Sequence, residues 1–238
     1  MKIQVLGTGS SGNCYKVEIG EATLLLECGL PFKVIQKKLD FKVSEIDACL
    51  VTHEHMDHAK AVKDLMKAGV DCYMTKGTAE ALGVSGHRLK AFNTWAECKY
   101  KTTYVKDLFI QPFEAVHDVA EPVSFHMGTK DEKESLVFVT DSAYLKYIIP
   151  DCDCLMIECN YVKSVLDKQV EDGKLNTNLR NRIVKNHMSL ETLVEALKVA
   201  DLSRCKQIYL MHLSDGNSDE KLIKRTIQET TGLEVVIC

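Results

Sequence analysis

Short apolar runs recur along the chain, some alternating with polar residues and some continuous, and both patterns are typical of β-strands. Between several of them, apolar residues return every three or four positions, which is the spacing of an amphipathic helix. The runs that predict strands are residues 3–6, 15–19, 23–27, 47–51, 72–74, 108–116, 123–127, 136–140, 154–157 and 208–211. The segments that predict helices begin at Pro31, cover residues 61–69, 78–82 and 190–199, and flank the strand at 154–157 on both sides. Strand and helix alternate in both halves, so the sequence predicts an α/β fold.

The chain is long enough to bury one complete core, since it has 238 residues of which 45% are hydrophobic. It contains no linker rich in Pro, Gly or Ser, no low-complexity tract and no internal repeat. We therefore expect a single domain that covers residues 1–238.

Histidines and an aspartate crowd the segment that follows the apolar run at 47–51. His53 and His55 are two positions apart, so in an extended chain both side chains project to the same side and can share one metal ion. Asp57 and His58 follow where the helical pattern starts, and this change of direction lets them face a second ion. The chain has only 8 histidines, which makes a chance cluster in a polar loop a poor alternative.

Composition indicates a soluble protein in a reducing compartment. No stretch has the apolar length of a transmembrane helix, and a strand begins directly after Met1 without a signal-peptide pattern. Ten cysteines, several of them inside apolar runs, also favour the cytoplasm. For Cys152, Cys154 and Cys159, buried thiols are favoured over a metal site because their spacing forms no zinc ribbon.

The formal net charge of −4 is not typical of a nucleic-acid-binding protein, but an enzyme that acts on a phosphodiester needs only a locally basic surface. Arg180 and Arg182 are expected to supply it, although a charged run often does no more than face solvent. Trp95 can offer a stacking platform for a base, with packing inside a loop as the alternative. The turn at 7–13 lacks the Lys-Ser/Thr of a P-loop, which argues against nucleotide binding.

The segment from His53 to His58 matches the His-x-His-x-Asp-His signature of the metallo-β-lactamase-fold hydrolases, and the chain resembles that superfamily over almost its whole length. Within it, the sequence is most similar to the bacterial YycJ/WalJ group, relatives of tRNase Z that are regarded as double-stranded DNA exonucleases. This resemblance implies a four-layer αββα sandwich. The segment between Asp141 and His212 is too short for the cap domain that β-CASP nucleases insert there. The other matching motifs are residues 9–13, 117–122, 140–144, 158–160 and 186–189.

The resemblance also implies two divalent metal ions and the ligands that complete their site. His117, Asp141 and His212 each follow a strand-like run and match the missing positions. Two ions lower the pKa of a bridging water, so that hydroxide forms near neutral pH, and they polarise phosphoryl oxygens. Zn²⁺ suits the His-rich set best, and Mn²⁺ is the rival because oxygen ligands also take part. The expected assignment is His53, His55 and His117 to the first ion, Asp57, His58 and His212 to the second, and Asp141 to both, with Asp57 also counted as catalytic.

His187 resembles the histidine of the His-Ser-Thr element that is assigned a proton-donor role in tRNase Z-like enzymes. It precedes an expected helix for which Ser189 is the N-cap. A carboxylate such as Glu158 or Asp57 would orient it. Simple lactonases and β-lactamases generally lack this element, so it favours phosphodiester hydrolysis.

The resemblance places the loop with Ser10, Ser11 and Asn13 beside the active-site cleft, where these side chains could donate hydrogen bonds to a substrate. Glu27 stands where relatives commonly have Asp. We expect its longer side chain to support the ligand loop by accepting hydrogen bonds.

These observations predict a metal-dependent hydrolase, with a phosphodiesterase or exonuclease as the first reading. Its nucleophile would be the metal-bridging hydroxide, its proton donor His187, and its substrate DNA in preference to RNA. A hydrolase of a small molecule such as a lactone, thioester or cyclic phosphodiester is the alternative. A non-catalytic module is disfavoured because all seven expected ligands are present.

Overall fold

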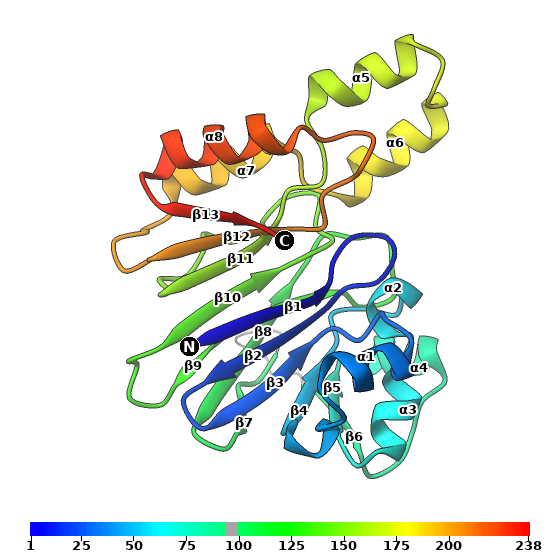
Figure 1. Cartoon of the computed structure of the whole chain (residues 1–238), viewed down its shortest axis with the longest axis vertical. Coiled ribbons are helices and arrows are strands. Elements are labelled where there is room, and N and C mark those ends of the chain that lie inside the picture. The colour runs from blue at the N-terminus through cyan, green and yellow to red at the C-terminus, as the bar shows by residue number, and fades with distance from the viewer. Residues whose placement is uncertain (94–99) are drawn as a thin grey trace. The chain divides into compact units, whose positions relative to one another are not determined.

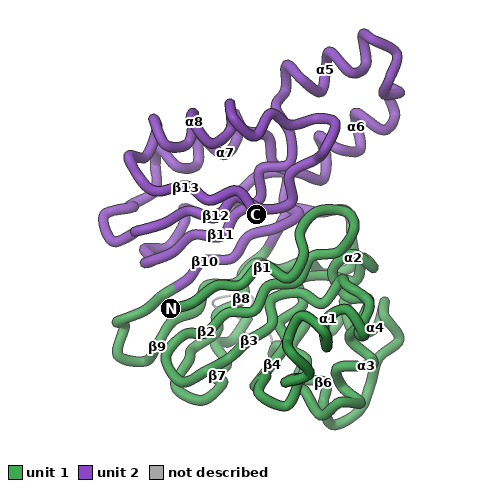
Figure 2. The backbone as a smooth tube through the Cα atoms, in the orientation of Figure 1, with its two compact units in different colours: residues 1–114, 119–135 green, residues 115–118, 136–238 purple. Residues whose placement is uncertain are grey.

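A computed structural model describes residues 1–93 and 100–238 of the chain, which form two compact units (Figure 2). Unit 1 comprises Met1–Glu114 and Val119–Ser135, and unit 2 comprises Ala115–Asp118 and Leu136–Cys238. The single domain expected from the sequence stays a prediction. Trp95 lies outside the described residues, so its stacking role stays a prediction as well.

Unit 1 contains a six-stranded sheet whose strands follow the order of the chain. Its first three strands are antiparallel and the remaining pairs are parallel. The strands are β1 (Lys2–Gly7), β2 (Cys14–Ile19), β3 (Ala22–Leu26), β4 (Ala48–Leu50), β5 (Asp71–Met74) and β6 (Leu89–Ala91). The connecting helices are α1 (Phe32–Lys38), η1 (Val43–Glu45), α2 (Met56–Ala59), α3 (Val62–Lys67) and α4 (Lys76–Leu82) (Figure 1).

The core of unit 1 lies between this sheet and its helices. Ile35 of α1 and Leu65 of α3 share one buried cluster with Leu25, Cys49 and Cys72 on the strands. Every residue of β4 is buried, as expected for a central parallel strand covered on both faces. The histidine-rich segment follows this strand directly, so the buried strand fixes the position at which that segment begins.

Unit 1 also contains an antiparallel set of three strands, β7 (Thr103–Val105), β8 (Leu108–Glu114) and β9 (Val123–Thr129). His126 lies on β9 opposite Gln111, with its ring edge-on to Phe109 at a centroid distance of 5.2 Å. The strand predicted for residues 123–127 is thereby confirmed.

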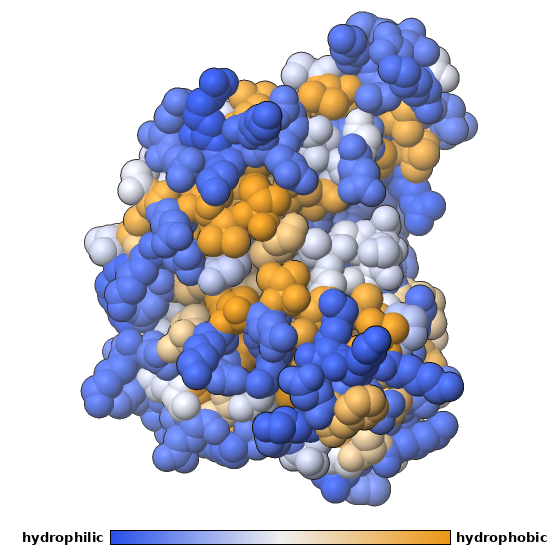
Figure 3. Space-filling model, viewed as in Figure 1, coloured by the Kyte–Doolittle hydropathy of each residue, from blue (hydrophilic) through white to orange (hydrophobic). Residues whose placement is uncertain are grey.

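Unit 2 is built on four parallel strands, β10 (Ser135–Val139), β11 (Cys154–Glu158), β12 (Gln207–Met211) and β13 (Glu234–Ile237). Its helices are α5 (Lys163–Glu171), α6 (Thr177–Asn186), α7 (Leu190–Val199) and α8 (Glu220–Thr231). Helices α7 and α8 pack on each other, and α8 packs on β13 (Figure 1). Figure 3 shows hydrophilic side chains over α8 and hydrophobic ones along β13. Helices α5 and α6 form a hairpin between β11 and α7, and no inserted domain is present among the described residues.

The prediction of a helix between residues 141 and 154 is wrong, because this segment is irregular in the structure. Ser142 holds it in another conformation: its Oγ accepts a hydrogen bond from Val116 N (2.9 Å) and donates one to the Tyr144 carbonyl (2.7 Å). Such local side-chain bonds compete with helix formation, and Pro150 limits the segment further. In the described ranges, no helix is long and apolar enough to cross a bilayer.

Candidate metal centre

In unit 1, four of the expected ligands lie together at the end of β4. His53 and His55 lie in the irregular segment between β4 and α2, with a bend at Glu54 between them, and their ring centroids are 4.8 Å apart. Helix α2 then begins at Met56 and carries Asp57 and His58, which brings the His58 ring within 4.2 Å of the His53 ring. The expected helix that carries Asp57 and His58 is confirmed, whereas the segment before it bends at Glu54 instead of staying extended.

Two loops hold helix α2 in place through its backbone carbonyls. Asn13 N donates to Asp57 O and Cys28 N donates to His58 O, both at 2.7 Å. Gly29 makes this approach possible, because a Cβ at that position would lie only 1.7 Å from Asp57 O. Glycine is therefore the residue that the contact requires.

Glu27 contacts the histidine-rich segment at Thr52 and at His58, as expected from the sequence. It is fully buried, its Oε1 accepts from Thr52 N at 3.1 Å, and its Oε2 lies 3.5 Å from His58 Nδ1. Burial raises the pKa of Glu27, and the neighbouring His58 and Thr52 oppose that rise. A carboxylate behind the Nδ1 of a histidine is the usual arrangement for one that binds metal through Nε2.

In unit 2, Asp141 lies between two histidines and presents a different oxygen to each. Its Oδ2 is 3.6 Å from His117 Nε2, and its Oδ1 is 3.5 Å from His212 Nε2. In unit 1, Asp57 Oδ2 lies 3.4 Å from His58 Nε2. Two ligand atoms bound at about 2.0–2.1 Å to one tetrahedral ion are about 3.3–3.4 Å apart. The donor types and their separations therefore fit divalent metal ions.

Polar neighbours occupy the Nδ1 side of these histidines. His53 Nδ1 lies 2.9 Å from Thr52 Oγ1, and His117 Nδ1 lies 3.0 Å from the Asn186 carbonyl. Such partners orient the rings and leave Nε2 for a metal. Asn186 also accepts a hydrogen bond from Asp118 N through its Oδ1 (3.0 Å). The sequence motif at 186–189 included Asn186, but its spacing could not reveal this supporting role.

Three site residues adopt left-handed backbone conformations just after buried strands. Glu27 follows β3 with φ 63°, Asp141 follows β10 with φ 46°, and His212 follows β12 with φ 54°. This region is uncommon for residues other than glycine and costs on the order of 1–3 kcal/mol each. Strain of this kind concentrates at functional sites, where it turns a side chain away from the strand direction.

His187 lies beside this cluster, between α6 and α7. Its Nδ1 is 2.7 Å from Glu158 Oε1, and its ring stacks on that of His212 at 5.4 Å. Glu158 is fully buried, whereas the His187 side chain is 19% exposed. The expected N-cap is confirmed, because Ser189 accepts a hydrogen bond from Thr192 N.

The same geometry also allows a second role for His187. Ligand atoms of Asp141, Glu158, His187 and His212 all lie within 4.8 Å of one another, so this group could itself hold an ion. His187 Nδ1 donates its hydrogen bond to the Glu158 carboxylate, so binding of a metal or transfer of a proton to a substrate would fall to Nε2.

The residues expected to contact a substrate differ in their surroundings. Ser10 and Ser11 are exposed, but Asn13 is fully buried and its Nδ2 lies 3.1 Å from His58 Nε2. Arg180 forms an ion pair with Asp167 at 2.8 Å, and Arg182 is exposed. The nearby Lys185 pairs with Asp118 and lowers the pKa of that exposed carboxyl. Contact with a substrate stays a prediction for these residues.

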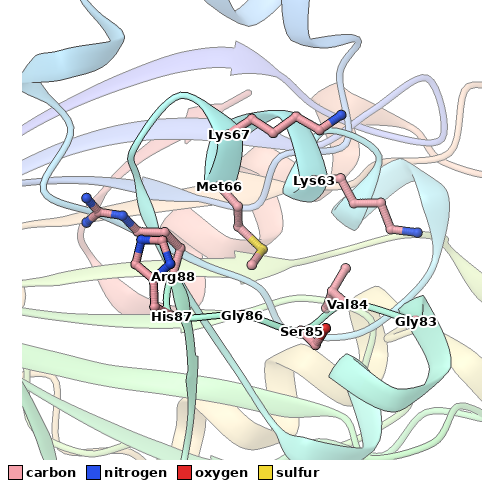
Figure 4. A pocket seen from close by; sticks show the side chains of 9 residues that line it. All are labelled: Lys63, Met66, Lys67, Gly83, Val84, Ser85, Gly86, His87 and Arg88. Carbon is pink, nitrogen blue, oxygen red and sulfur yellow. The ribbon is translucent and has the colours of Figure 1, made fainter.

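A cavity of about 430 Å³ lies on unit 1 between α3 and the loop before β6. Figure 4 shows Met66 at its centre, with the charged ends of Lys63 and Lys67 pointing away from Arg88. Arg88 already pairs with Asp71 at 2.9 Å. None of the expected ligands lines this cavity, and its cationic groups do not converge on one point.

Every cysteine in the described part of the chain is a free thiol. Cys152, Cys154 and Cys159 are buried, and burial raises the pKa of Cys154 to about 12. The groups of described residues that could hold an ion contain no cysteine. The expectation of buried thiols at this cluster is confirmed.

Comparison with known proteins identifies the family. The family model described as a β-lactamase superfamily domain matches residues 24–213, which include all seven expected ligands. The chain belongs to the β-lactamase superfamily and is a metal-dependent hydrolase of the metallo-β-lactamase fold. It is similar to the exodeoxyribonuclease WalJ of Streptococcus pneumoniae serotype 2, with 32% identity over 95% of this chain and 86% of the relative. It is also similar to the exodeoxyribonuclease YycJ of Bacillus anthracis, with 26% identity over 96% of this chain and 88% of the relative.

Solved structures agree with the fold class expected from the sequence. The metallo-β-lactamase fold protein YhfI of Bacillus subtilis superposes with a TM-score of 0.73, covering 99% of this chain and 95% of that protein. Its sequence identity is 19%, so the likeness concerns the fold alone. The mixed α/β architecture without an inserted cap domain is confirmed.

Proposed function

We propose that this chain is a dinuclear metal-dependent phosphodiesterase that acts as an exonuclease on DNA. His53, His55 and His117 would hold one ion, Asp57, His58 and His212 the other, and Asp141 both. The matched family model supports a single centre, since it spans ligands of both units. The two oxygens of Asp141 face different histidines, which supports its bridging role.

Two bound divalent ions supply an activated water near neutral pH and stabilise charge on the phosphoryl oxygens. Zn²⁺ is the preferred ion, because histidine nitrogens make up most of the ligand set. Mn²⁺ is the alternative because aspartate oxygens belong to the set.

The main structural support for a phosphodiester substrate is the pair formed by His187 and Glu158. Cleavage of a phosphodiester expels an alkoxide, so a proton donated in the transition state accelerates the reaction by roughly 10²–10⁴-fold. The buried Glu158 carboxylate orients the ring of His187 through Nδ1, and the ring is partly exposed, which suits proton transfer through Nε2. His187 would then donate to the leaving oxygen without binding metal.

Two further observations support DNA as the substrate and the cytoplasm as the location. Two similar curated relatives are exodeoxyribonucleases, and the matches cover 86% and 88% of their chains. The free, mostly buried cysteines suit a reducing compartment. Arg180 and Arg182 on α6 would line the path of the polyanion, with Ser10, Ser11 and Asn13 as further contacts.

The proposal is tested with purified protein reconstituted with Zn²⁺ or Mn²⁺. End-labelled single- and double-stranded DNA, matched RNA, a cyclic nucleotide and a lactone are incubated in parallel, with Asp141→Ala as the control. We expect stepwise shortening of DNA that requires metal and is absent in the control. Turnover of the lactone or cyclic nucleotide without any cleavage of DNA would overturn the proposal in favour of a small-molecule hydrolase.

A further inference from the structure

The irregular segment after Asp141 exposes an unusual set of side chains. Tyr144 is 51% exposed, Tyr147 53% and Ile148 67%, and the exposed Lys146 lies among them. Large apolar groups that cluster on a surface commonly mark a binding site. In the described part of unit 2, the other large hydrophobic residues with comparable exposure are Leu179 and Val199, on two different helices.

The start of this segment is fixed, so the exposure of Tyr144 does not come from a loose loop. Ser142 N donates to Glu158 Oε2 at 3.2 Å, and Ala143 N donates to Val116 O at 2.9 Å. The hydroxyl of Ser142 then donates to the carbonyl of Tyr144 itself. These bonds connect Tyr144 to the residue before His117 and to the carboxylate that orients His187.

Tyr144 is also close to the metal ligands. It is three residues from Asp141, and three residues of extended chain span at most about 10–11 Å. Stacked bases in a nucleic acid follow one another at about 3.4 Å. The Tyr144 backbone therefore lies within about three base steps of the backbone of Asp141, whose carboxylate would bridge the ions.

We propose that Tyr144 is a stacking platform for a base within about three nucleotides of the scissile phosphate, so that the enzyme holds the end of a DNA strand unpaired. An aromatic face stacks on any base, which suits an exonuclease that must accept every sequence. Tyr147 and Ile148 extend the apolar surface, and Lys146 adds a positive charge for the backbone. This inference rests on the proposed nuclease function and specifies how the substrate end is bound.

The test compares Tyr144→Ala and Tyr144→Phe with Tyr104→Ala, a control at a tyrosine of similar exposure on β7. The substrates are single-stranded oligonucleotides that carry either normal bases or an abasic nucleotide at the 5′ or the 3′ end, and kcat/KM is read at the end where degradation starts. The metal content of each variant is measured in parallel.

We expect Tyr144→Ala to lose roughly five- to a hundredfold in kcat/KM on the normal substrate and almost nothing on the abasic one. Tyr144→Phe and Tyr104→Ala should both stay near wild type, with full metal content in all three variants. An equal loss on both substrates, or no loss on either, overturns the stacking role while leaving nuclease activity intact. If wild-type protein cleaves neither these oligonucleotides nor double-stranded DNA, the proposed function itself fails and the inference fails with it. Cleavage of double-stranded DNA alone overturns only the inference, because an enzyme that holds an unpaired end should accept an end that is already unpaired.

Discussion

Oε1 of Glu158 lies 2.7 Å from Nδ1 of His187, a pairing between a fully buried carboxylate and a partly exposed imidazole. The same carboxylate accepts hydrogen bonds through Oε2 from Ser142 N and Met188 N, both at 3.2 Å. Its position is thus fixed from three sides. A carboxylate held in this way fixes the tautomer and direction of the imidazole beside it, as in acid–base catalysis.

Replacement of His187 by Ala should therefore impair the reaction without removing metal. On DNA we expect kcat to fall at least about a hundredfold, because the leaving alkoxide loses its proton donor. On bis-p-nitrophenyl phosphate the loss should largely vanish, since this leaving group needs no proton. Both rates and the metal content are measured on the same preparation.

Two outcomes would contradict this role for His187. Loss of metal in His187→Ala would make the residue a ligand, which its position near Asp141 and His212 also permits. Unchanged cleavage of DNA would leave it with a purely structural role. Glu158→Gln is the matched variant, because it keeps the size of the partner while removing the charge that favours a protonated ring.

The second prediction concerns Gly29, whose absent side chain lets the loop approach helix α2. Gly29→Ala places a Cβ against Asp57 O and should lower the free energy of unfolding by at least about 2–3 kcal/mol. It should also reduce metal content, because Asp57 and His58 must move with their helix. Gly216→Ala is the control, since a Cβ there meets nothing within 4 Å. Equal free energies of unfolding for the two variants would contradict this prediction, because they would show that the loop can move away from α2 at little cost.

The third prediction concerns the metal content of the protein. Elemental analysis after reconstitution should give close to two ions per wild-type chain. His212→Ala should lose mainly one of them, because that ion keeps only Asp57 and His58 besides the bridging Asp141. Full occupancy in this variant would mean that His212 is not a ligand and that the assignment of the second ion is wrong.

The fourth prediction concerns the salt dependence of DNA binding. Each lost phosphate contact should reduce the slope of log K against log salt concentration by about 0.7–0.9. We expect this change for Arg182→Ala and for Arg180→Ala, with a smaller effect at Arg180 because Asp167 already pairs with it. Arg225→Ala on α8 is the control for net charge alone. A short chromogenic phosphodiester should be almost unaffected, and an equal loss on it would indicate a structural role for these arginines.

Much of the centre could be predicted because short spacing rules apply to it. Asp57 and His58 lie at the start of a helix that the apolar spacing predicts, and His53 and His55 lie two positions apart just before it. Ser189 is a helix N-cap that its sequence context indicates directly. Contacts between segments that are distant in sequence cannot be predicted from spacing. The approach of Gly29 to Asp57 therefore becomes apparent only in the folded structure.

The helix predicted between residues 141 and 154 is absent from the structure for a local reason. Its apolar residues fit a helical spacing, but the side chain of Ser142 bonds to the backbone on both sides and holds an irregular conformation. Secondary-structure propensity also does not predict the left-handed backbone conformation at Asp141 and His212, because tertiary structure imposes it. These departures from local preference fall at the ligands themselves.

The most direct test of the dinuclear nuclease is a metal titration of the protein followed by its activity. Metal-free protein receives increasing equivalents of Zn²⁺, or of Mn²⁺ in a parallel series, while nucleotide release from end-labelled DNA and bound metal are measured together. We expect no release without metal and a maximal rate when two ions are bound per chain. Release of nucleotides by the metal-free protein, or no release with two ions bound, would contradict it.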